Sequence, residues 1–389
     1  MNLKIKKTLI WAGGILAVSA IIYSCLPYYA RQALIHLMPK INDLEIFSKN
    51  TVQAEADSSY IWPKAYDYNT YSLEKEDEAY IDSLKTVSFL LIQNDSLVFE
   101  SYRNGWNDTL TSNIYSATKS IVGLLTGIAV EEGKIGSIDD PVSKYIPTYT
   151  KGLQADVTIR NLLTMSASMG WDEAYSSLFS VTTHGYYGND LYDLVANLPV
   201  EEKPGVNYSY RSGETQLLAF VVEAATGKTI SEYAMEKLWT PMHAERNAYW
   251  LLDKENGDEK AFCCFHTIAR DMARFGHLML NDGKWMGTQV VPEWYMREAT
   301  SPADYLIDEW GKDHLDYYGY QIWIMNYKGA KYPYMRGMLG QYMVAIPEHN
   351  AIFVRLGHKR SKVKLRDLPA DLVRYMDIVM KMLDEREIQ

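Results

Sequence analysis

A serine and a lysine three residues apart form the pattern in this chain that is best suited to covalent chemistry. The pattern S-x-x-K occurs twice, at Ser72 with Lys75 and at Ser116 with Lys119. On a helix this spacing places the hydroxyl and the amine on one face, with Cβ atoms about 5–6 Å apart. A lysine that has lost its proton can accept the proton of the serine, which is a poor nucleophile by itself. The chemistry indicated is acyl transfer to a serine.

The surrounding sequence distinguishes the two copies. Ser72 and Lys75 lie in an acidic stretch, YSLEKEDE, with no apolar helix behind it. Ser116 and Lys119 precede SIVGLLTGIAV at residues 120–130, which predicts an apolar helix. A helix start supplies positive potential and free N–H groups where an oxyanion would form, and burial would favour the neutral form of Lys119. The alternative is a capping serine beside a solvated lysine.

A tyrosine-rich loop provides a candidate for a second proton carrier. Residues 203–213, KPGVNYSYRSG, combine a Pro-Gly turn with two tyrosines and lead into an apolar segment. Tyr210 is the candidate for returning a proton to the leaving group, and Tyr208 is its rival. A surface loop with two packing aromatic residues is the alternative.

Other kinds of site have little support. The sequence contains no G-x-S-x-G, H-E-x-x-H or Walker A motif, and its 8 histidines are scattered, so we expect neither a metal ion nor a cofactor. The net charge of -10 argues against nucleic-acid binding. Cys25, Cys263 and Cys264 are too few for a disulfide framework, and we interpret the adjacent pair as a structural feature of its segment.

The N-terminus predicts attachment to a membrane. Lysines at positions 4, 6 and 7 precede an uncharged run over residues 8–30. At about 1.5 Å per residue this run can cross a bilayer core of about 30 Å, with the lysines on the cytoplasmic side. An uncleaved anchor, a cleaved signal peptide and a lipoprotein signal with acylated Cys25 remain alternatives. Each places the catalytic part outside the cytoplasm, on the periplasmic side of a bacterial inner membrane.

The rest of the chain predicts an arm and one catalytic domain. We assign residues 1–30 to the membrane or signal segment, 31–64 to a membrane-proximal arm and 65–389 to the catalytic domain. Residues 88–102 predict two strands about a turn at 94–96. The sequence further predicts helices over residues 114–132, 159–165, 191–198, 214–225, 230–238, 269–280 and 365–383, and strands over 318–326, 338–346 and 351–357. Strands at both ends with helices between them indicate an α+β domain.

Several of these segments together resemble the β-lactamase-related serine hydrolases, over roughly residues 88–357. This group includes penicillin-binding DD-peptidases, class C β-lactamases, family VIII esterases and 6-aminohexanoate-dimer hydrolases, and the last of these look most similar. The segments that carry the resemblance are YSATKS at 115–120, LLTMSASMGWDE at 162–173, PGVNYSYRSGETQLLA at 204–219, TIARDMARFG at 267–276 and GMLGQY at 337–342.

The resemblance implies a β-lactamase/DD-peptidase-like fold, with a roughly five-stranded antiparallel sheet flanked by helices and a mainly helical subdomain. It implies Ser116 as nucleophile, Lys119 and Tyr210 as proton carriers, and the backbone N–H groups of Ser116 and Met338 as oxyanion donors. The further residues that it places near the substrate are Gly337, Ser212 and Tyr175.

The reaction implied is hydrolysis of an amide, ester or peptide bond in a small-molecule substrate through an acyl-enzyme. A DD-peptidase or β-lactamase is an alternative, and so is a weakly active envelope protein that binds peptidoglycan or a partner. Two departures from the family's motifs favour the weakly active envelope protein. Ser212 replaces the usual Asn, and Met335 replaces the usual K-T-G cation. Arg336 should point away from the face of Met335 and so not replace that charge. We therefore expect β-lactams and D-Ala-D-Ala peptides to be poorer substrates than an uncharged linear amide or small ester.

Overall fold

The computed structural model describes residues 3–388, except for the side chains at positions 3–10, 13 and 388. Its helices are α1 Leu3–Cys25, α2 Tyr28–His36, α3 Lys75–Ser83, α4 Thr118–Glu131, α5 Ile159–Leu163, α6 Val181–Tyr187, α7 Leu191–Ala196, α8 Ser212–Thr226, α9 Ile230–Ala234, α10 Ala269–Leu280, α11 Glu293–Ala299 and α12 Ala370–Ile388. Its strands are β1 Lys49–Val52, β2 Thr86–Gln93, β3 Ser96–Tyr102, β4 Ser112–Asn113, β5 Ala248–Leu251, β6 Phe265–Thr267, β7 Lys284–Trp285, β8 Thr288–Gln289, β9 Trp323–Tyr327, β10 Ala330–Gly337, β11 Gln341–Ile346, β12 Ala351–Gly357, β13 Lys364–Leu365 and β14 Leu368–Pro369.

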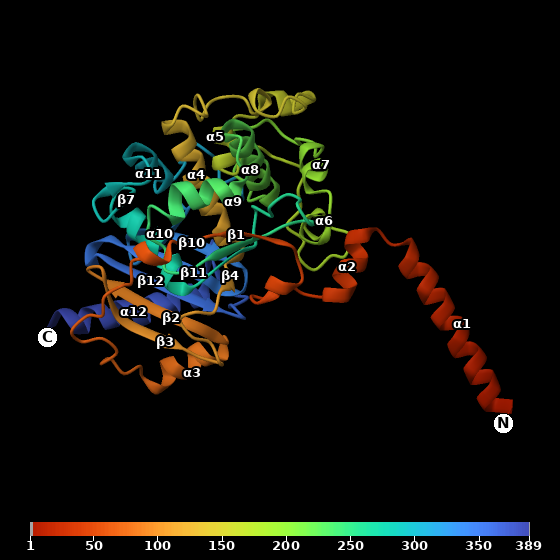
Figure 1. Ribbon diagram of the computed structural model, residues 1–389, viewed down its shortest axis with the longest axis horizontal. Coiled ribbons are helices and arrows are strands. Elements are labelled where there is room, and N and C mark those ends of the chain that lie inside the picture. Colours follow the sequence, from red (N-terminus) through yellow and green to blue (C-terminus); the bar gives the residue numbers. More distant parts are fainter. Residues whose placement is uncertain (1–2, 389) are drawn as a thin grey trace.

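An antiparallel sheet of six strands forms one layer, in the order β3-β2-β12-β11-β10-β9 (Figure 1). The predicted turn between β2 and β3 is confirmed, with Asn94 and Asp95 at φ 49° and 57°, as a tight hairpin requires. Every residue of β2 is buried, because α10 packs on one face of the sheet and α12 on the other. The α+β class is confirmed, with six strands rather than about five.

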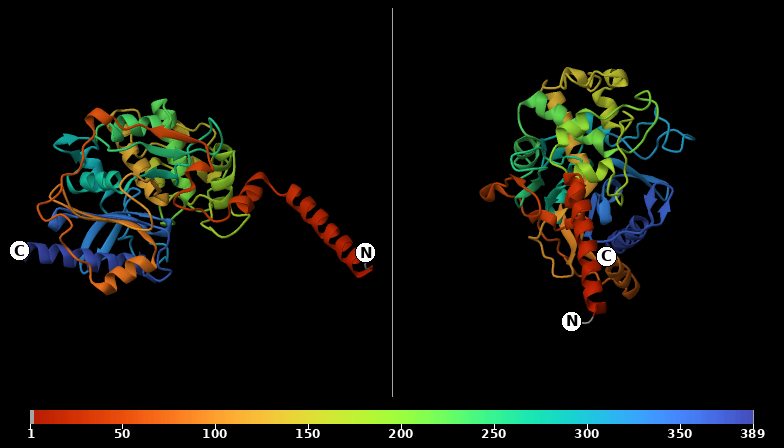
Figure 2. Two further views of the ribbon diagram at one scale, coloured as in Figure 1. Left: turned by 60° about the horizontal axis from the view of Figure 1, so that its bottom comes forward. Right: turned by 90° about the vertical axis from the view of Figure 1, so that its right-hand side faces the viewer.

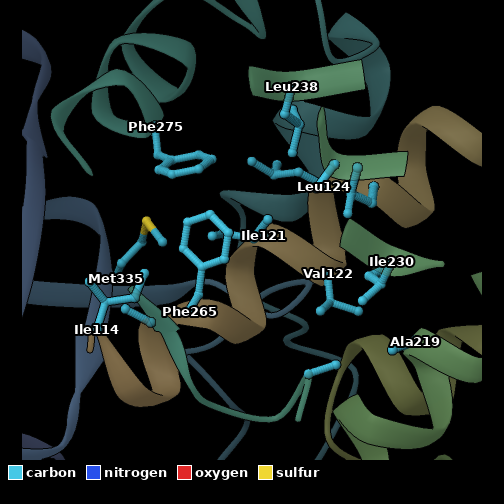
Figure 3. Packing of buried hydrophobic residues seen from close by; sticks show 14 of the residues in the cluster. Ile114, Ile121, Val122, Leu124, Ala219, Ile230, Leu238, Phe265, Phe275 and Met335 are labelled. Atoms are coloured by element: carbon cyan, nitrogen blue, oxygen red, sulfur yellow. The ribbon is translucent and has the colours of Figure 1, made fainter. Parts of the chain in front are cut away.

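The second part of the molecule is mainly helical and has α4 at its centre. Helix α4 packs against α8, α9 and α11. Ile121, Val122 and Leu124 of this helix lie in a cluster of buried apolar residues that also contains Phe265 (Figure 3). A smaller sheet that the sequence did not predict, in the order β1-β5-β6-β4, lies beside these helices. The apolar helix that begins beside Ser116 is therefore the core of this subdomain.

Four predicted elements begin later than expected, because of local backbone restrictions. The strand predicted at 318–326 begins at Trp323, after Gln321 with a φ of 57°. Residues 364–369 form the β13–β14 hairpin, so α12 begins only at Ala370, after a proline that disfavours helical geometry in the residue before it. The strand predicted at 338–346 begins at Gln341, since Leu339 and Gly340 have φ 62° and 84°. The helix predicted from residue 114 begins at Thr118, after a 3₁₀ turn at Tyr115–Ala117.

The segment predicted as a membrane-proximal arm packs against the catalytic part. Strand β1 pairs antiparallel with β5, and Ile41 is fully buried. The end of the segment assigned to residues 1–30 packs there too, since the rings of Tyr29 and His184 stack with centroids 4.3 Å apart. Helix α2 thereby lies on α6, while α1 extends away from the rest of the chain (Figure 2).

The described part of the chain contains no helix that meets the length and apolarity needed to span a membrane. Part of the predicted segment at 8–30 lies outside the described side chains. The finding does not support the predicted anchor, and the localisation stays a prediction.

Candidate active site

The turn that carries Ser116 joins strand β4 to helix α4. Tyr115, directly before the serine, has a φ of 47°, a left-handed conformation that costs a non-glycine residue about 1–3 kcal/mol. This conformation is held by hydrogen bonds from Tyr115 N–H to Asn113 Oδ1 (2.8 Å) and from Ile114 N–H to Phe265 O (2.9 Å). The turn places Ser116 in the walls of two cavities.

Lys119 is buried directly beside the serine. It is 1% exposed, and its Nζ lies 3.3 Å from Ser116 Oγ and 2.5 Å from Phe262 O. Burial lowers the pKa of Lys119 to about 8, against the opposing charge of Glu173. A substantial fraction of this amine is therefore neutral near pH 8 and can accept a proton from Ser116.

Tyr210 lies near both Ser116 and Lys119. Its ring centroid is 5.3 Å from Lys119 Nζ and 5.3 Å from the ring centroid of Trp323. Burial, and then the charge of Glu173, raises the pKa of Tyr210, while a hydrogen bond with Ser116 acts in the opposite direction. Its hydroxyl therefore keeps its proton at neutral pH and can donate it.

The rival candidates lie away from this group. Tyr208 is 1% exposed, and its ring packs against the rings of Tyr317 and Tyr318. Ser72 and Lys75, the other S-x-x-K copy, are both exposed. The structure thus brings Ser116, Lys119 and Tyr210 together, and neither rival joins them.

Gly337, the last residue of β10, and Met338, directly after it, lie beside the turn that carries Ser116. A Cβ on Gly337 would lie 2.1 Å from Ile114 O, so only a glycine allows β10 to approach the nucleophile turn this closely. Met338 lines both cavities together with Ser116. The residues expected to supply the oxyanion donors are therefore adjacent in space.

Strand β10 presents its arginine, and not its methionine, to the site. Met335 is fully buried near Ile114 in the core (Figure 3). Arg336 lines a cavity with Ser116 and Tyr210, and its guanidinium carbon lies 3.4 Å from the ring centroid of Trp323. The two side chains do point to opposite faces, but the expectation that this strand supplies no cation to the site is wrong, because alternation does not say which face borders the cavity.

Glu173 connects the remaining predicted residues. Ser212 donates its N–H to Glu173 Oε1 (2.5 Å) and its hydroxyl to Glu173 Oε2 (3.2 Å), and Tyr175 also donates its hydroxyl to this carboxylate. The sequence motifs indicated Tyr175 and Ser212 but not Glu173. The signal that could have identified Glu173 is its position two residues after Trp171, in the segment that follows the first motif.

The adjacent cysteines also lie at the site. Cys263 and Cys264 are joined by a disulfide, and they directly follow Phe262, whose carbonyl accepts the hydrogen bond from Lys119. Cys263 lines one of the two cavities. No pattern in the sequence placed this pair near Ser116.

The two cavities meet at Ser116, Tyr175 and Met338. One has a volume of about 240 Å³ and extends to α2 and α6, and the residues that form its far wall are Ala33, Leu37, Met38, Pro39, Tyr186 and Tyr187. The other has a volume of about 490 Å³ and contains Tyr210, with the charged residues Glu173, Glu309, Arg336, Arg360, Lys364 and Asp367. Ser116 is therefore accessible from an apolar side and from a charged side.

A sheet, a helical subdomain and, between them, a Ser-Lys-Tyr group with a buried lysine define a serine-hydrolase type of site. The family model described as Beta-lactamase matches residues 78–375. This chain belongs to that family, and it is a β-lactamase-related protein of the serine hydrolase superfamily.

Individual relatives are similar over shorter stretches or at low identity. The chain is 27% identical over 233 residues to a 6-aminohexanoate-dimer hydrolase of Paenarthrobacter ureafaciens, an alignment that covers 57% of this chain and 59% of that enzyme. A Bacillus anthracis structure assigned as a 6-aminohexanoate-dimer hydrolase has a TM-score of 0.74 and 22% identity, covering 88% and 92% of the two chains. A family VIII carboxylesterase has a TM-score of 0.62 and 16% identity, covering 82% and 98%. The two structures support the fold, and the family match together with the 27%-identical relative supports a hydrolase-type function.

Proposed function

We propose that this protein hydrolyses amide or ester bonds through an acyl-enzyme on Ser116. The observation that carries the proposal is the buried Lys119, whose Nζ lies 3.3 Å from Ser116 Oγ and whose pKa is lowered to about 8. A neutral amine at this distance is a general base for the serine hydroxyl.

In the first half-reaction, Lys119 accepts the proton of Ser116 as Oγ attacks the substrate carbonyl. The oxyanion formed is stabilised by the backbone N–H groups of Ser116 and Met338. Tyr210 then donates its proton to the leaving group, the bond to that group breaks, and the acyl group stays on Ser116. In the second half-reaction the deprotonated Tyr210 accepts a proton from the attacking water. Lys119 returns its proton to Ser116 Oγ as the bond between Oγ and the acyl carbon breaks and the acid is released.

The test is covalent labelling and turnover by the purified full chain. We expect a fluorophosphonate probe to label the wild type, and Ser116→Ala to abolish labelling and to lower ester turnover by about 10³-fold or more. Ser72→Ala, in the exposed S-x-x-K copy, is the matched control and should behave like the wild type. Activity retained in Ser116→Ala but lost in Ser72→Ala would refute the assignment.

A further inference from the structure

The cavity that faces α2 and α6 offers almost only apolar surface to a ligand. None of its lining residues is charged. Thr183 donates its hydroxyl to Ser177 O and Tyr187 donates its hydroxyl to Leu37 O, so these groups are already used. Tyr115 Oη and Tyr186 Oη have no hydrogen-bond partner among the described residues, but both atoms are buried. A ligand in this cavity gains by burying hydrocarbon and not by hydrogen bonding.

The proton donor determines which part of the substrate enters this cavity. Tyr210 lines the charged cavity and is absent from the lining of the apolar one. The leaving group must lie near the residue that protonates it, and so it belongs on the charged side. The acyl group, on the other side of the same carbonyl carbon, is then directed into the apolar cavity.

The outer wall of the apolar cavity comes from the N-terminal segment. Ala33, Leu37, Met38 and Pro39 lie there, outside the residues matched by the family model, 78–375. Leu37 and Met38 are 68% and 56% exposed, so the cavity is open at this end. A space that runs from the nucleophile to the surface between apolar walls fits an extended chain.

We propose that this cavity binds the aliphatic acyl chain of an ester or amide substrate, with the segment at residues 33–39 as the determinant of chain-length preference. This inference rests on the proposed function of Ser116. Each methylene transferred from water into the cavity should raise kcat/KM by about fourfold until the cavity is full.

The experiment is a chain-length series of p-nitrophenyl esters, from acetate to decanoate, on the full chain. In the wild type, kcat/KM should rise from acetate to a longer ester and then level off. Met38→Asp places a charge in the wall, and it should lower the ratio of octanoate to acetate kcat/KM by about tenfold. Ala33→Phe, which fills the cavity instead, should lower the same ratio.

Ile35→Asp is the matched control. Ile35 lies in α2, is 56% exposed like Met38 and does not line the cavity, so this variant should keep the wild-type ratio. A flat chain-length series in an enzyme whose acetate hydrolysis depends on Ser116 would overturn the acyl site and leave the proposed function standing. An unchanged ratio of octanoate to acetate kcat/KM in both Met38→Asp and Ala33→Phe would also overturn the acyl site and leave the proposed function standing. Absence of Ser116-dependent turnover for every ester would overturn both.

Discussion

Of the two cavities that meet at Ser116, one has six charged side chains in its walls and the other has none. The charged cavity is built largely from β10 and the segments around residues 309 and 360–367, in the last third of the chain. The apolar cavity is built from the N-terminal segment, residues 175–187 and the turn at residues 262–263. The nucleophile therefore separates two environments that select for different chemistry.

The site is therefore asymmetric with respect to the scissile bond. Ser116 and Met338, whose N–H groups are expected to stabilise the oxyanion, line both cavities, whereas Tyr210 and Arg336 line only the charged one. Changes on the charged side should depend on the leaving group, and changes on the apolar side should depend on the acyl group. The predictions below follow from this separation.

Tyr210→Phe should have the largest effect, and the effect should depend on the leaving group. We expect kcat/KM to fall by about 10²- to 10⁴-fold for an alkyl ester or an amide, whose leaving groups need a proton. The fall should be much smaller for the p-nitrophenyl ester of the same acid, because nitrophenolate leaves without protonation. Steady-state kinetics on the paired substrates is the measurement. Tyr208→Phe is the control, and equal losses on both substrates would place the leaving group elsewhere.

Arg336→Gln should show an intermediate effect that depends on charge. The two hydrogen bonds of Arg336 end at Tyr334 Oη and Asp367 O, both uncharged acceptors. An anionic leaving group could therefore bind its guanidinium, and the variant should lower kcat/KM for such an ester by about 5- to 150-fold. An ester with a neutral leaving group should be little affected.

The exposed Lys331, on the same strand, provides the control Lys331→Gln. Equal losses for charged and neutral leaving groups in Arg336→Gln would exclude a charge-recognition role.

Carboxylate-bearing β-lactams and D-peptides were expected to be poor substrates because β10 was predicted to supply no cation to the site. Since Arg336 lines the cavity, that reason no longer holds.

Glu173→Gln should have the smallest effect, seen as a shift of the pH profile. The charge of Glu173 raises the pKa of Lys119, which burial lowers to about 8. Lys119 acts as a base only when neutral, so kcat/KM should rise with pH through this pKa. Removing the negative charge should move the midpoint of that rise to lower pH. Glu309→Gln, in the same cavity, is the control, and an upward shift in Glu173→Gln would contradict the coupling.

The sequence by itself determined the local elements and the type of chemistry. Helix α10 is found at Ala269–Leu280, as predicted from apolar periodicity, and the hairpin turn at Asn94 lies where its turn residues indicated. The spacing of Ser116 and Lys119 predicted that their side chains meet, although Ser116 lies in the 3₁₀ turn before α4 and not in the helix. These features depend on neighbours within a few residues, and so they can be recognised in the sequence.

The tertiary structure decided which groups meet. Lys119 contacts the carbonyl of Phe262, 143 residues away, and its lowered pKa comes from burial by segments distant in sequence. Alternation along β10 separated Met335 from Arg336 but could not say which face borders the site. The apolar cavity depends on residues 33–39 packing beside residues 175–187. Burial, and with it the pKa of a buried amine, is a property of the assembled chain, because it depends on what packs against the group and not on its neighbours in sequence.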